Sequence, residues 1–287
     1  MLTQLNVTLK ALRPLHWPHF AGGRLRGAFG RALRQASCIT LAEDCQGCKL
    51  RSSCAYGQVF DPAKANKVLH PSFQDGIPAY VIQPPALGAQ DLQPGDEKKF
   101  SLLLLPTAAA HLSLVQHILQ EVVEKHLFNP GDCTLHDIEV QAVGVPLQRL
   151  VKHQIALQWL SPLRLQNQGQ PMTRGQQLDP RTLVQAAWRR QLQYRQLSGQ
   201  TATAVEPLLQ AADQCLLDTR QLQWHAISRY STHKNLYLPL DGLLGTAILT
   251  GPAAALQNLL PLLEMGELLH IGKATVFGLG RFQIRVD

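Results

Sequence analysis

Residues 270–286 read HIGKATVFGLGRFQIRV and form the most specific segment of the chain. Glycines at positions 272, 278 and 280 lie in a strand-like context, where they remove side chains at points that another backbone must approach closely. A β-bulge or a tight hairpin would use such glycines equally well. The segment follows no strand-to-helix turn, so it does not fit a dinucleotide-binding fingerprint. We therefore expect a glycine-punctuated strand over residues 268–286.

Working outward from this segment, the hydrophobic periodicity predicts one set of elements in each half of the chain. In the second half these are strands over 151–166, 223–230 and 236–249, a helix from Pro180 capped by Asp179, and a helix over 252–263. In the first half they are a strand over 2–12, a basic helix from Gly22, strands over 80–83, 99–105 and 134–143, and a helix over 108–125. The repeated order predicts an α+β fold with a duplicated unit, in domains 1–147 and 148–287.

Charge is distributed unevenly along the 287 residues, whose formal net charge is +7. Lys and Arg exceed Asp and Glu by six in residues 1–60 and by six in residues 148–287, whereas residues 61–147 carry an excess of five acidic side chains. If the basic ends meet in the fold, they favour a polyanionic ligand; the alternative is that the basic charge only keeps the protein soluble. No apolar run is long enough for a membrane span and no export signal is present, so we expect a cytoplasmic protein.

Four of the six cysteines fall within one short stretch, as Cys38-x6-Cys45-x2-Cys48-x5-Cys54. In a chain without an export signal, such a cluster is more typical of a metal site than of disulfides. We expect a small four-cysteine knuckle with structural zinc, with an iron–sulfur cluster, redox disulfides or no metal as alternatives. Four thiolate ligands leave no open coordination position, so such a metal would stabilise the fold and take no part in catalysis.

Several segments occur in a defined order along most of the chain. They are GGRLRGAFGRAL at 22–33, CAYGQVFDP at 54–62, SPLRLQNQG at 161–169, RYSTHKNLYLPLDGLLG at 229–245 and LLEMGELLHIGKATVFGLGRF at 262–282. This ordered set resembles the CRISPR precursor-RNA processing endoribonuclease family of the RAMP superfamily, most weakly over residues 61–130.

The resemblance implies tandem ferredoxin-like (RAMP/RRM-like) domains and a glycine-rich loop at 272–281 that holds RNA. It also implies metal-independent cleavage of CRISPR repeat RNA, in which a 2′-hydroxyl attacks the phosphate and leaves a 2′,3′-cyclic phosphate and a 5′-hydroxyl. No cofactor is then needed for catalysis. The expected partners are the hairpin precursor RNA, its product and other CRISPR effector subunits, with no membrane and no direct DNA contact.

Members of this family commonly place a histidine near the first strand–helix junction, where this sequence has His16 and His19. We prefer His19 as the base because it lies closer to the start of the basic helix, although both histidines could simply pack against the sheet. The related proteins tend to read Arg-Tyr-Ser-x-Arg-Gln in the segment that begins at Arg229 here. This chain has His233 and Lys234 in place of the final Arg and Gln. These two residues are therefore further catalytic candidates.

Candidate RNA contacts are the cations, the tyrosine and the glycines of the matching segments: Arg24, Arg26, Arg31, Arg229, Tyr230, Gly272, Lys273, Gly278, Gly280 and Arg281. No serine-hydrolase elbow, HExxH motif or metal-ion loop is present, which argues against a hydrolase triad and a two-metal nuclease. Two other interpretations stay open: a catalytically inactive RAMP subunit that binds guide RNA, and a zinc-stabilised scaffold for protein partners.

Overall fold

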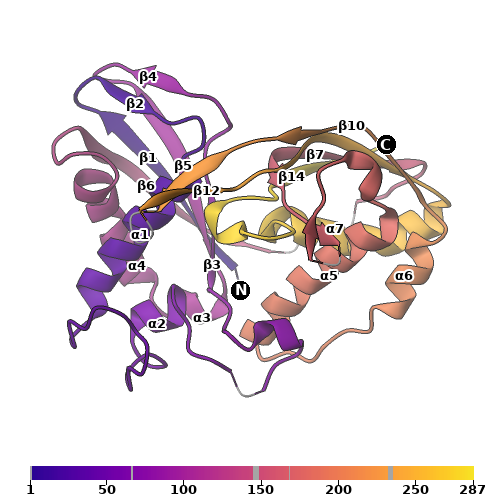
Figure 1. Cartoon of the computed structure of the whole chain (residues 1–287), viewed down its shortest axis with the longest axis horizontal. Coiled ribbons are helices and arrows are strands. Elements are labelled where there is room, and N and C mark those ends of the chain that lie inside the picture. Colours follow the sequence, from indigo (N-terminus) through magenta and orange to yellow (C-terminus); the bar gives the residue numbers. More distant parts are fainter. Residues whose placement is uncertain (1, 66, 145–148, 168, 232–234) are drawn as a thin grey trace. The chain divides into compact units, whose positions relative to one another are not determined.

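The computed structural model describes residues 2–65, 67–144, 149–167, 169–231 and 235–287. The chain divides into two compact units (Figure 1). The first unit consists of residues 1–144 together with residues 193–201, and the second of residues 145–192 and 202–287. Among the helices that the structure describes, none combines the length and the apolar composition needed to cross a bilayer.

The first unit is built on an antiparallel four-stranded sheet with the order β3-β5-β1-β6. Its strands are β1 (Leu2–Ala11), β3 (Tyr80–Gln83), β5 (Glu97–Leu104) and β6 (Cys133–Val143). Helix α1 (Gly22–Ser37) follows β1, and α4 (Leu112–Glu121) follows β5. Apolar side chains recur along one face of α1, and Leu25, Phe29 and Leu33 of that face are buried.

Short elements complete this unit. They are β2 (Leu15–Trp17), α2 (Ala55–Val59), η1 (Pro71–Phe73), β4 (Gln90–Leu92), α3 (Pro106–Ala109) and the π-helical η2 (Val122–His126). The single helix expected over 108–125 is therefore wrong, because it is broken after α3 and widens into η2. The widened turn leaves backbone carbonyls that accept hydrogen bonds from other groups. The carbonyl of Val123 accepts from the Cys133 thiol at 3.0 Å.

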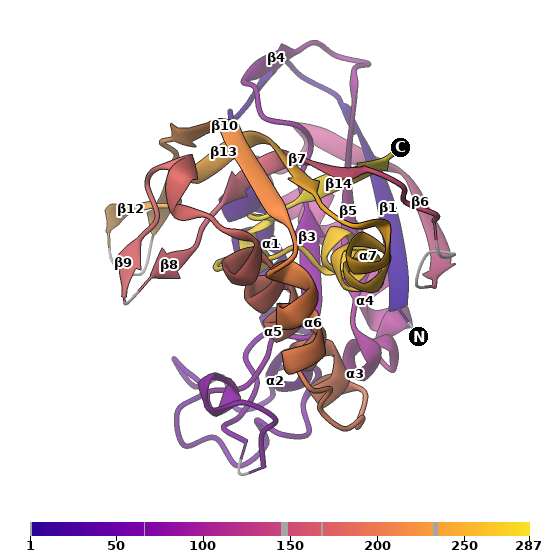
Figure 2. The ribbon, with the colours of Figure 1, turned by 90° about the vertical axis from the view of Figure 1, so that its right-hand side faces the viewer.

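The second unit repeats the arrangement with the sheet order β10-β13-β7-β14, again antiparallel. Its strands are β7 (Gln154–Leu163), β10 (Leu216–His225), β13 (Gly242–Thr250) and β14 (Phe282–Val286). Helix α5 (Pro180–Leu197) follows β7 and α7 (Ala253–Leu269) follows β13 (Figure 2). Asp179 caps α5 as predicted, since its Oδ1 accepts from the backbone N–H of Thr182 at 2.7 Å.

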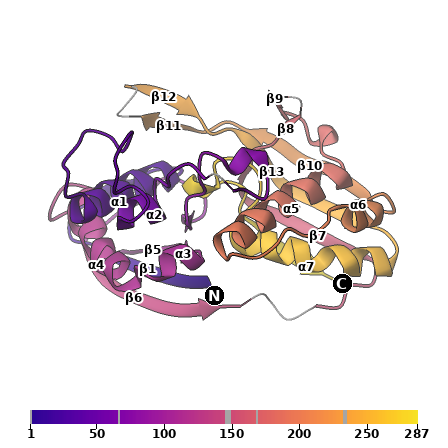
Figure 3. The same cartoon turned by 90° about the horizontal axis from the view of Figure 1, so that it is seen from below.

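Additional elements of the second unit are α6 (Glu206–Ala212), which the sequence did not predict, η3 (Gly175–Gln177), η4 (Thr275–Phe277) and two small strand pairs. One pair is β8 (Gln166–Asn167) with β9 (Gln170–Pro171), and the other is β11 (Ser228–Ser231) with β12 (Leu236–Pro239). Figure 3 shows β11 and β12 as a ribbon that continues from β10 and β13.

Three predicted strands of the second unit were wrong in their extent. The expected strand over 236–249 is β12 followed by β13, because the two parts pair with different strands, β12 with β11 and β13 with β10 and β7. The expected strand over 223–230 is two strands, because the backbone N–H of Ile227 between them bonds Asp241 Oδ1 at 2.9 Å instead of a neighbouring strand. The expected strand over 268–286 is the end of α7, a loop with the short η4, and β14. The loop forms because several of its residues adopt positive φ angles, which a strand does not accommodate.

Both units thus follow the order strand, helix, strand, strand, helix, strand, and in both sheets the first and third strands lie between the fourth and the second. This is the ferredoxin-like arrangement. The prediction of an α+β fold with tandem ferredoxin-like domains is confirmed.

Candidate functional site

The glycine loop, residues 270–281 of the second unit, packs tightly against the end of β7. Gly272 has a φ of +89°, and a Cβ added there would lie 2.6 Å from the carbonyl oxygen of Arg164. Gly280 has a φ of +70°, and its added Cβ would lie 1.7 Å from the carbonyl oxygen of Ile271. The expectation that another backbone approaches these glycines is correct. That backbone belongs to the same unit, so glycine is required here whether or not a ligand binds.

Hydrogen bonds fasten the glycine loop to the end of β7 and to Arg164, the residue that follows this strand. The backbone N–H of Lys273 donates to Arg164 at 2.8 Å, and that of Gly280 donates to Pro162 at 2.9 Å. The hydroxyl of Ser161, which is 3% exposed, donates to the carbonyl of Gly278 at 2.7 Å and accepts from the backbone of Arg281 at 2.9 Å. The loop is therefore a rigid platform.

The β11–β12 hairpin contacts this platform at its base. The Arg229 guanidinium lies 4.5 Å from the ring centroid of Phe277, which belongs to the glycine loop. Arg164 also donates through Nη1 to the carbonyl of Pro239 at 2.8 Å. Arg164, Arg229 and Lys273 consequently gather around one junction of three segments.

Two exposed tyrosines project from the hairpin. Tyr230 and Tyr237 are directly opposite in the strand register, their ring centroids are 5.3 Å apart, and they are 49% and 71% exposed. The Tyr230 hydroxyl donates to Asn235 Oδ1. Exposed aromatic rings beside cations are the components that stack and grip nucleic acid bases. His233 and Lys234 lie outside the described residues, so their catalytic role stays a prediction.

The two ends of the glycine loop, His270 and Arg281, form a positive cluster with Arg190 of α5, in which His270 and Arg190 are buried and Arg281 is half-buried. Burial lowers the pKa of Arg281, and burial lowers the pKa of Arg190 to about 10. His270 is fully buried, and burial, followed by the charges of Arg281 and Arg190, lowers its pKa well below the ordinary value. A neutral, inaccessible imidazole of this kind packs the loop and is poorly placed for proton transfer to a ligand.

The first unit presents the two histidines of the predicted site. His16 lies on β2, and its Nδ1 is 2.7 Å from Oδ1 of Asp91 on β4; both side chains are well exposed. His19 is exposed just before α1, and its backbone carbonyl accepts from Gly88 at 3.0 Å. The sequence analysis did not single out Asp91, which lies 75 residues from His16 and pairs with it only because β2 and β4 are joined.

The arginines of α1 have partners within the first unit. Arg24 lies 4.8 Å from the ring centroid of Phe128, and Arg31 donates to the carbonyl of His126 at 3.0 Å. Arg26 lies 4.5 Å from the ring centroid of Phe60. These contacts fix the side chains along α1, and the proposed RNA-binding role of all three stays a prediction.

Cys38, Cys45, Cys48 and Cys54 line one pocket of the first unit, and all four are free thiols. As the side chains stand, no group of three or more His, Cys, Asp or Glu residues within the described ranges is arranged to hold a metal ion. The zinc expected from the sequence therefore stays a prediction.

Family models match nearly the whole chain. A model described as an N-terminal domain, AF_1859_N, matches residues 1–160, and the model of the CRISPR-associated endoribonuclease Cas6 matches residues 157–282. Over these residues, slightly less than half of the chain, the sequence matches the Cas6 endoribonuclease family. The Cas6 match contains the β11–β12 hairpin and the glycine loop to its end. A comparison with curated protein sequences gives no match.

Solved structures of Cas6 proteins have the same fold. A Cas6 product complex gives a TM-score of 0.60 at 14% identity, covering 99% of this chain and 100% of that one. Thermus thermophilus Cas6 gives a TM-score of 0.57 at 13% identity, covering 99% of this chain and 98% of that one. A partial Cas6-RT-Cas1–Cas2 complex gives a TM-score of 0.59 at 14% identity, and the match covers all of this chain. This chain spans 46% of the matched chain in that complex and 29% in a second Cas6-RT-Cas1–Cas2 complex.

Proposed function

We propose that this protein cleaves CRISPR repeat RNA without a catalytic metal and releases mature guide RNA. The observation that carries the proposal is the match of residues 157–282 to an endoribonuclease family, over the same residues that hold the hairpin and the glycine loop. In the proposed reaction the 2′-hydroxyl beside the scissile phosphate attacks phosphorus and loses its proton to a base. The bond to the 5′-oxygen breaks, and that oxygen takes a proton, which leaves a 2′,3′-cyclic phosphate and a 5′-hydroxyl.

The second unit is proposed to hold the RNA. Positive charge at one junction comes from Arg229, Lys273 and Arg164. Contacts from these cations to phosphate groups would supply most of the affinity for RNA. Tyr230 and Tyr237 supply exposed rings for stacking on unpaired bases. The positive charge of the buried Arg190 and the half-buried Arg281 adds to the attraction for phosphate. Because the platform is rigid, little ordering is needed when RNA binds.

The base is proposed to be one of the two histidines of the first unit. The sequence favours His19 as the base. The contact with Asp91 supports His16 as an alternative, because Asp91 Oδ1 can accept the Nδ1 proton of His16 at 2.7 Å. With the proton on Nδ1, Nε2 carries the lone pair that accepts the 2′-hydroxyl proton, and the carboxylate stabilises the imidazolium that forms.

Cleavage of a labelled hairpin repeat in excess EDTA tests the proposal. We expect one product with a 2′,3′-cyclic phosphate, which phosphatase alone does not remove, and a second with a 5′-hydroxyl that polynucleotide kinase labels directly. A matched repeat with a single 2′-deoxynucleotide before the scissile phosphate should bind with equal affinity and stay intact. Cleavage of that repeat, or dependence on added Mg²⁺, would contradict the mechanism.

The same assay separates the two alternative functions. An inactive RAMP subunit would bind the repeat without cleaving it, and a protein scaffold would neither bind nor cleave it. Because Cas6 also occurs in Cas6-RT-Cas1–Cas2 complexes, we propose other CRISPR subunits as further partners of this protein.

A further inference from the structure

The cysteine segment, residues 38–54 of the first unit, has no helix or strand and not one fully buried side chain. The only members that are not exposed are the four cysteines and Arg51. Its apolar side chains are exposed, with Ile39 and Leu41 81% and 86% exposed. Ordering such a segment costs conformational entropy that apolar burial does not offset here, so another interaction must hold it in place.

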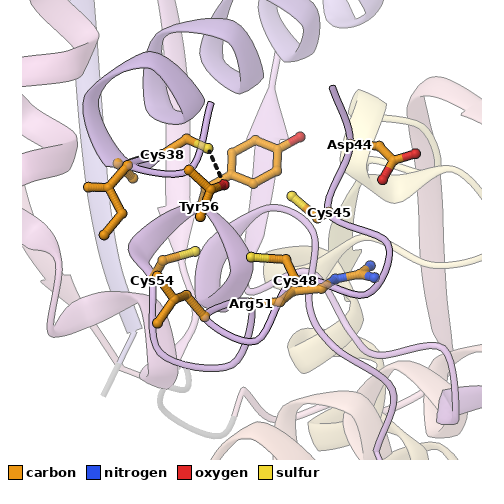
Figure 4. A pocket seen from close by; sticks show the side chains of 11 residues that line it. Cys38, Asp44, Cys45, Cys48, Arg51, Cys54 and Tyr56 are labelled. Atoms are coloured by element: carbon orange, nitrogen blue, oxygen red, sulfur yellow. Dashed lines mark hydrogen bonds between the residues drawn. The ribbon is translucent and has the colours of Figure 1, made fainter. Parts of the chain in front are cut away.

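The four cysteines come from both ends and from the middle of this segment. Cys38 is the residue after α1, Cys45 and Cys48 lie on the connecting loop, and Cys54 is the residue before α2. Figure 4 shows their sulfur atoms facing a shared pocket. They stand apart within it, so metal binding requires these side chains to move toward one another.

The backbone forms a tight turn between Cys45 and Cys48, as the backbone does in a zinc knuckle. The N–H of Cys48 bonds the carbonyl of Cys45 at 3.3 Å, and Gly47 between them takes a φ of +74°. The Cys54 sulfur accepts from the backbone N–H of Gly57 at 3.3 Å. Backbone donors to sulfur of this kind orient and stabilise thiolate ligands.

Two arginines hold the segment in place through hydrogen bonds. Arg51 donates through Nε and Nη2 to the carbonyl and the carboxylate of Asp61, at 3.1 and 2.8 Å. Arg34 of α1 donates to the carbonyl of Ala42. A divalent ion with four thiolates carries a net charge of −2, which these two cations would offset.

We propose that Cys38, Cys45, Cys48 and Cys54 bind one Zn²⁺ ion in a tetrahedral site that ties the end of α1 to the start of α2. Each thiol that becomes a ligand loses its proton to solvent as its sulfur binds the metal. The four protein ligands leave no open position, so the ion is structural. The proposal does not rest on the proposed ribonuclease function.

Elemental analysis of the full chain, purified without oxygen or chelator, tests the stoichiometry. We expect about one zinc ion per chain and no iron. Iron with acid-labile sulfide would show an iron–sulfur cluster and overturn the proposal. A metal-free protein that also fails to take up added Zn²⁺ under reducing conditions would overturn it as well.

Cobalt substitution with two matched variants identifies the ligands. The Co²⁺ form should show intense sulfur-to-cobalt charge-transfer absorption with tetrahedral d–d bands, and Cys48→Ala should lose most of this signal. Cys215→Ala, which removes a buried cysteine of the second unit, should keep it. Equal signals from the two variants would show that the segment does not supply the ligands, and circular dichroism verifies that both variants are folded.

Limited proteolysis reports on the structural role without any assay of RNA. Removal of the metal should raise the rate of cleavage within residues 38–54 by about tenfold or more, because local opening becomes easy once the ligand bonds are lost. Restoring Zn²⁺ should reverse the effect. Unchanged proteolysis after verified metal removal would contradict the structural role. A zinc-bound protein that cleaves no RNA would support this site and count against the ribonuclease proposal.

Discussion

The two units repeat one strand order, but the segments that follow their helices are held in different ways. After α7 of the second unit, the glycine loop is fastened to β7 by backbone hydrogen bonds and by close backbone contacts at Gly272 and Gly280. After α1 of the first unit, the cysteine segment has no such packing and depends on side chains. One sheet topology can thus support a rigid platform in one copy and a set of reactive side chains in the other.

The proposed function assigns different tasks to the two units, with a histidine of the first unit as the base and the second unit as the part that holds the RNA. The largest effect is expected for His16→Ala, which should slow single-turnover cleavage by about 10²- to 10⁴-fold. Repeat-RNA affinity should change little, because a neutral imidazole contributes little to phosphate binding. His19→Ala is the matched control. If His19→Ala alone loses the rate, the base is His19, and if neither variant does, the histidine mechanism of the first unit fails.

The rigidity of the glycine loop is tested by two glycines of the second unit with similar φ angles. Gly280→Ala should lower the free energy of unfolding by about 3 kcal/mol or more, since the new Cβ would meet the Ile271 carbonyl at 1.7 Å. At Gly169, where φ is +83°, an added Cβ meets no described atom within 4 Å, so Gly169→Ala should cost only about 1 kcal/mol. Urea unfolding measures both values. Equal losses would show that the backbone approach at Gly280 relaxes.

Burial of His270 should make the second unit sensitive to acid. The unfolded chain binds a proton at His270 below about pH 6.5, whereas the folded chain resists it because its pKa is lowered by burial and by Arg281 and Arg190. The stability contributed by the neutral histidine is therefore complete above pH 6.5 and falls as the pH decreases. Between pH 7 and pH 5 the loss should approach about 2 kcal/mol. His270→Asn should show a correspondingly smaller loss in urea unfolding at the two pH values, and an identical loss would contradict the assignment.

The smallest expected effect concerns the cation at the hairpin base. Arg229→Ala should weaken repeat-RNA binding about fivefold and reduce turnover by a similar factor, because a cation on a phosphate acts in both the ground state and the transition state. The slope of log K against log salt should become shallower by about 0.7. Arg220→Ala is the control, since Arg220 of the same unit is exposed and paired with Asp218 at 2.6 Å. Equal slopes for the two variants would remove Arg229 from the RNA surface.

Local patterns in the sequence were sufficient for the regular elements. The strand over 80–83 and the cap at Asp179 match the structure, and the basic helix from Gly22 begins where its apolar periodicity begins. Such elements are predictable because periodic burial and a capping side chain are properties of neighbouring residues. The ordered motifs also indicated the ferredoxin-like pair and the family, and the family match covers residues 157–282.

Only the tertiary structure decided which distant groups meet. His16 and Asp91 are joined by the pairing of β2 with β4, and Arg229 contacts Phe277 because the hairpin base lies on the glycine loop. The break at Ile227 likewise depends on the side chain of Asp241. None of these contacts leaves a periodic signal, because each joins segments whose separation is fixed only after the strands pair. The sequence therefore determined the elements and the chemistry that they carry, and the folded sheets determined which side chains could act together.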